Sequence, residues 1–159
     1  MQTKQEPTQY DECGETILDL AKMLIGKYHS HLATKKMKFL YINKPITRKG
    51  RTVAATAEKI SDKIRAISDD IDFLITISYP IFNDLSDELK QYVLDHELCH
   101  CWVDESDSGD EKNVILPHDF EDFNEVVSRY GALTLEIQKL REVLKKVNNK
   151  NKDNEDAKE

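Results

Sequence analysis

The run His96-Glu97-Leu98-Cys99-His100 places two imidazoles and a carboxylate within about one turn of a predicted helix. It belongs to the segment Leu85–Trp102, which predicts one amphipathic helix with Ser86 as its N-cap. Residues four apart project from the same helix face, so His96 and His100 can hold one zinc ion. Glu97 lies beside them, where a carboxylate can take a proton from a metal-bound water. The His-Glu-x-x-His pattern therefore predicts a hydrolytic zinc centre with Glu97 as general base.

A catalytic zinc ion usually has three protein ligands and a water molecule, so this pattern requires one more ligand. His118 is the remaining downstream histidine, and it follows Pro117. A loop of about seventeen residues can fold back and bring it to the first pair. Glu121, Glu125 and an acidic residue of the loop are the alternatives, because carboxylates also bind catalytic zinc. The predicted ligand set is thus two histidines from the motif with His118 as third ligand.

The three cysteines favour a reducing compartment. Cys99 and Cys101 are two apart on the predicted helix and point in different directions, so they are not expected to pair. Thiolates bind zinc, but Cys99 and Leu98 are expected to face the core as small apolar side chains. A cytoplasmic location, in a bacterial host cell, is therefore expected.

Length and composition predict one soluble domain. The chain has 159 residues, of which 39% are hydrophobic and 33% charged, with a net charge of −7. We expect a single domain over residues 10–147, with disordered ends at 1–9 and 148–159. No stretch approaches the roughly 20 apolar residues of a membrane span, and the polar N-terminus does not read as a secretory signal. The negative charge argues against nucleic acid as the main partner.

Periodicity predicts an α+β fold. Expected helices and strands alternate with turns and an acidic loop at Val103–Pro117. Pro45 and Gly50 predict a turn over Lys44–Gly50, and Ser61–Asp70 is read as a short helix or a loop. The predicted helices are Tyr10–His31, Leu85–Trp102 and Asp119–Val147, and the predicted strands are Phe39–Ile42, Thr52–Ile60 and Ile71–Tyr79.

The motifs resemble those of the phage metallopeptidase family. The matching segments are Asp95–His100, Pro117–Phe123 and Arg129–Gly131. More distantly, they are similar to the SprT-like minimal zincins. This resemblance implies a minimal zincin-like domain, in which an N-terminal helix and a small three-stranded sheet accompany the motif helix and a long C-terminal helix follows. It also implies that Ile71–Tyr79 is an edge strand that binds extended substrate.

By the same resemblance, His96, His100 and His118 are the zinc ligands, Glu97 is the general base, and the reaction is peptide-bond hydrolysis. The oxyanion then requires a second electrophile, for which Tyr130, Arg129 and Tyr79 are candidates.

Four other polar residues have expected roles outside the ligand set. Asp95 and Asp119 are possible partners of the ligand imidazoles, although capping or solvent exposure explains them equally well. His29 and His31 are two apart and make a poor metal pair, so we expect them to be exposed or to carry charge near a helix end.

The sequence therefore predicts a zinc-dependent metallopeptidase, phage-encoded and intracellular, acting on a protein or peptide. The alternative is a non-catalytic zincin-fold module that inhibits or adapts a host protein, for which the acidic run Asp104–Glu111 offers a surface. A third hypothesis, a peptidase recruited to DNA, is disfavoured by the net charge. Oligomeric state is not indicated.

Overall fold

The computed structural model describes residues 7–118, 129, 139–140 and 142–147. By its contacts the chain divides into two units, residues 1–116 and 117–159. The described residues 129, 139–140 and 142–147 of the second unit are helical. Most of the predicted helix Asp119–Val147, the end 148–159 and residues 1–6 lie outside the described residues. No helix in the described part of the chain has the length and apolar character needed to cross a membrane.

The first unit is built on a four-stranded mixed sheet in the order β1-β2-β6-β5. Strands β2 and β6 are parallel, whereas β1 and β5 run antiparallel to their neighbours. The four strands are β1 (Tyr10–Glu12), β2 (Met37–Ile42), β5 (Ala55–Lys59) and β6 (Phe73–Ser78). The sheet thus has one strand more than predicted, because Tyr10–Glu12 pairs with β2 instead of beginning the first helix.

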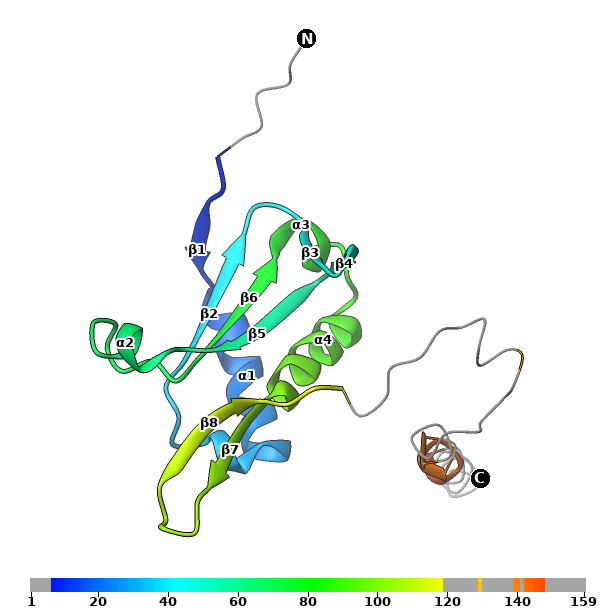
Figure 1. Cartoon of the computed structure of the whole chain (residues 1–159). Helices are drawn as coiled ribbons and strands as arrows, with labels where there is room; N and C mark the ends of the chain where they lie inside the picture. Colours follow the sequence, from blue (N-terminus) through cyan, green and yellow to red (C-terminus); the bar gives the residue numbers. More distant parts are fainter. Residues whose placement is uncertain (1–6, 119–128, 130–138, 141, 148–159) are drawn as a thin grey trace. The chain divides into compact units, whose positions relative to one another are not determined.

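Helices α1 (Glu15–Tyr28) and α4 (Asp87–His100) cover one face of this sheet (Figure 1). Apolar residues at three- and four-residue spacing turn one side of each helix toward the strands. The buried core includes Ile17, Ala21 and Leu24 of α1, Leu94 and Leu98 of α4, and Phe73, Ile75 and Ile77 of β6. Helix α1 begins at Glu15, later than predicted, and the 3-10 turn η1 (Ser30–Leu32) follows it.

Helix α4 ends at His100, two residues earlier than predicted, and the chain turns directly into a hairpin. Strand β7 (Cys101–Glu105) pairs antiparallel with β8 (Glu111–Ile115), so the expected acidic loop is wrong. The sequence shows no clear strand pattern here, because most of this hairpin is exposed and its strands bury few side chains. Gly109 at φ 81° makes the turn between them.

A second hairpin replaces the expected turn at Lys44–Gly50. Strands β3 (Ile46–Arg48) and β4 (Arg51–Val53) pair through a two-residue turn, in which Lys49 and Gly50 have φ of 47° and 74°. Two positive φ angles are what a tight hairpin turn of right-handed twist requires. The predicted strand Thr52–Ile60 is accordingly divided between β4 and β5. The short helices α2 (Asp62–Arg65) and α3 (Tyr79–Phe82) flank β6 in sequence.

The expectation that Ile71–Tyr79 forms the edge strand is wrong. Strand β6 is an inner strand, since β2 pairs with one of its sides and β5 with the other. Its apolar residues Phe73, Ile75 and Ile77 are fully buried, as is typical of an inner strand. The edge strand of this sheet on the α4 side is β5, as Figure 1 shows.

Candidate metal centre

The last turn of α4 carries all three motif residues. Ser86 is the N-cap of the helix, and its side chain accepts a hydrogen bond from the Leu89 backbone N–H at 3.3 Å. Leu94 and Leu98 are fully buried and fix the opposite side of the helix in the core. The motif histidines, which are half-buried, are therefore presented from a helix that packing holds in place.

The imidazoles of His96 and His100 lie side by side, with ring centroids 5.1 Å apart and planes at 79°. One ligand nitrogen from each of these rings and one from His118 all lie within 4.8 Å of one another. The structure thus brings together the three residues predicted to bind the metal.

A short connection explains how His118 reaches this position. The Leu116 backbone N–H donates to the His100 carbonyl at 2.8 Å, and His100 Nδ1 lies 2.6 Å from the Leu116 carbonyl. Since a carbonyl only accepts, Nδ1 is the protonated nitrogen and a neutral His100 keeps Nε2 as its electron-pair donor. Only Pro117 separates this anchored residue from His118.

Glu97 is buried, and burial raises the pKa of its carboxyl group. Three neighbours act in the opposite direction and lower this pKa: the charge of His100, the backbone N–H of Ala57, which donates a hydrogen bond, and the charge of Arg48. The effect of His100 shows that Glu97 is close enough to a motif histidine for their charges to interact. The hydrogen bond from Ala57 ties its carboxylate to edge strand β5.

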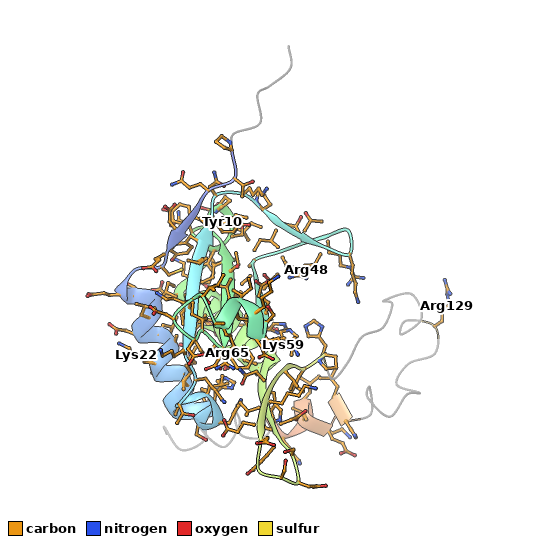
Figure 2. The ribbon with its side chains drawn as sticks, turned by 60° about the vertical axis from the view of Figure 1, so that its left-hand side comes forward. Tyr10, Lys22, Arg48, Lys59, Arg65 and Arg129 are labelled. Atoms are coloured by element: carbon orange, nitrogen blue, oxygen red, sulfur yellow. The ribbon has the colours of Figure 1, made fainter. Side chains whose placement is uncertain are left out.

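Arg48 and Ala57 are the residues of this centre that the sequence did not reveal. Arg48 belongs to a basic cluster that looks like an ordinary solvated loop, and Ala57 acts only through its backbone. The hairpin β3–β4 and the antiparallel pairing of β5 bring them to Glu97 (Figure 2 labels Arg48). Neither relation has a local sequence signal.

Asp95, expected either to partner a ligand imidazole or to cap the helix or lie exposed, contacts a histidine at the C-cap of α1. Its carboxylate lies 2.6 Å from His29 Nε2. His29 is buried at the C-cap of α1, so it has the expected position near a helix end but not the alternative of exposure. His31 Nε2–H donates to the Cys101 carbonyl at 3.0 Å. Asp119 lies outside the described residues.

The two cysteines near the motif differ from expectation. Cys99 is exposed, so the prediction that it faces the core is wrong, whereas Cys101 is buried at the start of β7 rather than on the helix. Burial raises the pKa of the Cys101 thiol to about 12.

The proposed second electrophiles gain no support from the described geometry. Tyr79 packs edge-to-face on Tyr41, with ring centroids 5.3 Å apart. Arg129 is an exposed residue of the second unit. Tyr130, like the alternative ligands Glu121 and Glu125, lies outside the described residues.

A family profile described as "putative phage metallopeptidase" matches residues 10–148. The chain belongs to this family. The matched range includes the whole four-stranded sheet, α4 and His118, so the phage metallopeptidase family covers every residue of the centre described above. Neither the curated proteins nor the solved structures contain a significant match to the chain. The expected distant similarity to SprT-like proteins stays a prediction.

Proposed function

We propose that this member of the phage metallopeptidase family is a zinc-dependent peptidase that works inside the bacterial host cell and uses Glu97 as general base. One observation carries the proposal. Donor nitrogens of His96, His100 and His118 converge within 4.8 Å. The buried carboxylate of Glu97 directly follows His96 in the sequence, and the charge of His100 acts on its pKa.

The donor set fits zinc. Three neutral imidazoles are a known catalytic zinc ligand set, and they leave a coordination position for water. The hydrogen bond from His100 Nδ1 to the Leu116 carbonyl leaves Nε2 for the metal, as such outer partners do in zinc sites. When bound, a zinc ion polarises a carbonyl group and lowers the pKa of a water ligand toward neutrality.

Glu97 performs the proton transfers in this proposal. Its carboxylate takes a proton from the attacking water and later delivers it to the leaving amine nitrogen. Burial raises its pKa toward the working pH, which favours both steps, and the Ala57 N–H holds the carboxylate in orientation. Arg48 adds a positive charge near the same carboxylate and is a better-supported electrophile candidate than Tyr79.

Strand β5 supplies the peptide-binding edge. The Ala54 carbonyl and the Ile60 N–H bond toward β6, whereas the Ala57 N–H bonds away from it to Glu97. By alternation, the backbone groups of Ala55, Ala57 and Lys59 face the outer edge. An extended substrate added there as a further strand passes the general base.

The test replaces Glu97 with Gln and measures metal content and turnover together. We expect the same zinc content in parent and variant, with cleavage of a denatured-protein digest, read by mass spectrometry, at least about 100-fold slower in the variant. Glu88→Gln is the matched control, because Glu88 is an exposed carboxylate in the first turn of the same helix.

Two outcomes would contradict the proposal. If the Glu97→Gln protein cuts a verified substrate as fast as the parent, Glu97 is not the general base. A parent with no metal, or one that binds a partner stoichiometrically without ever cutting it, would favour the non-catalytic binding module.

A further inference from the structure

A second group of metal-binding donors lies on a different face of α4. One donor atom each from His29, Asp95 and Cys99 lies within 4.8 Å of the other two. His29 comes from the C-cap of α1, while Asp95 and Cys99 are four residues apart on α4 and so project together. We propose that these three side chains form a second site for a divalent metal ion of the zinc type.

The donor chemistry suits such an ion. Zinc binds imidazole nitrogen, carboxylate oxygen and thiolate sulfur, and this group offers one of each. Hard cations such as magnesium prefer oxygen donors alone, so the set selects against them. Because the Cys99 side chain is exposed, water can complete a four-coordinate site.

The geometry needs only a small adjustment. His29 Nε2 and Asp95 Oδ1 are 2.6 Å apart, which is a hydrogen-bond distance. Two ligands of one tetrahedral zinc ion are about 3.3 Å apart, so the pair must open by about 0.7 Å. The Asp95 side chain is 38% exposed, while His29 is held at 7%, so the aspartate is the partner able to rotate.

The second site would join two elements that the first does not. Consecutive helix residues are about 100° apart, so the pair Asp95 and Cys99 does not share the face of His96 and His100. A metal ion bound to His29 and this pair links the end of α1 to the last turn of α4. It therefore stabilises the helix turn from which the candidate catalytic histidines project.

Cobalt distinguishes the sites, because a thiolate ligand to cobalt gives a near-ultraviolet charge-transfer band that imidazole ligands alone do not. The chain is stripped of metal with a chelator under reducing conditions and titrated with Co²⁺. We expect two ions per chain and this band. In the His96→Ala/His100→Ala variant one ion and the band should remain, whereas in Cys99→Ala one ion should remain without it.

Cys13→Ala is the matched control, because it also removes a thiol, but one that is buried in the core away from this group. It should keep both ions and the band. As a second readout, zinc should raise the thermal midpoint of the His96→Ala/His100→Ala variant but not that of the same variant with Cys99→Ala added.

An unchanged band in Cys99→Ala would overturn the proposal, as would a His96→Ala/His100→Ala variant that binds no cobalt. If the proposed peptidase centre binds no metal, the result is different: the parent would then bind a single ion and still show the thiolate band.

Discussion

At the scale of single residues, the carboxyl group of Glu97 is subject to opposing influences. Burial favours its protonated form, whereas His100, the Ala57 N–H and Arg48 favour its ionised form. Burial is the largest of these effects, so the net shift of the pKa is upward. A general base with a raised pKa is a stronger proton acceptor near neutral pH, but only while it remains ionised. The positive charge of Arg48 and the Ala57 N–H therefore help to keep the base ionised.

Removing the charge of Arg48 should raise the pKa of Glu97 further. The base is active when ionised, so in Arg48→Ala the acidic limb of the kcat/KM profile should move to higher pH. Arg48→Lys keeps the charge and should leave this limb nearly in place. Because Arg48 is exposed, the difference should shrink at high salt. An unmoved limb in Arg48→Ala would show that Arg48 does not act on Glu97.

At the scale of elements, β5 has two distinct sides. Its even-numbered residues bond to β6, and its odd-numbered residues face the outer edge beside α4. The same strand thus completes the sheet and positions Glu97. The strand that lies next to the centre, Ala-Thr-Ala-Glu-Lys, has no bulky apolar residues.

Proline substitutions test the two sides of β5 separately, because proline lacks the N–H donor. Lys59→Pro should raise KM about 2- to 10-fold, the effect of one lost hydrogen bond, with little change in the free energy of unfolding. Lys59→Ala, which keeps the N–H, is the control for the side chain (Lys59 is labelled in Figure 2). Glu58→Pro removes a donor to β6 and should destabilise the chain by about 2 kcal/mol or more. Equal KM values for Lys59→Pro and Lys59→Ala would exclude this edge as the substrate strand.

At the scale of the whole molecule, the sequence predicted the parts with strong local patterns. Helix α4 and strand β6 follow from periodicity, and motif spacing singled out His96, His100 and His118, whose donor atoms lie within 4.8 Å of one another. Strand β1 and the β7–β8 hairpin were missed, because short exposed strands bury too little to leave an apolar pattern. The strand order, and with it the edge position of β5, depends on pairing between distant segments. The same holds for the His29–Asp95 contact.

Alkaline pH should weaken the first unit through its buried thiols. Burial raises the pKa of Cys13 from 9.0 to about 12. Between these values the unfolded chain releases the proton and the folded chain keeps it, so the stability present below pH 9.0 falls as the pH rises. One such thiol contributes a slope of about 1.4 kcal/mol per pH unit. Urea unfolding across this range should show a shallower decline in Cys13→Ala; identical slopes would contradict the assignment.

The paired hydrogen bonds between His100 and Leu116 fix the two ends of the β7–β8 hairpin to each other. The distance between the motif and His118 therefore does not depend on how many residues the hairpin places between them. The turn at Ser106–Asp110 can lengthen, shorten or receive a grafted recognition peptide while both ends stay clasped. Changes of length or sequence at this exposed tip are therefore expected to leave the candidate metal centre in place.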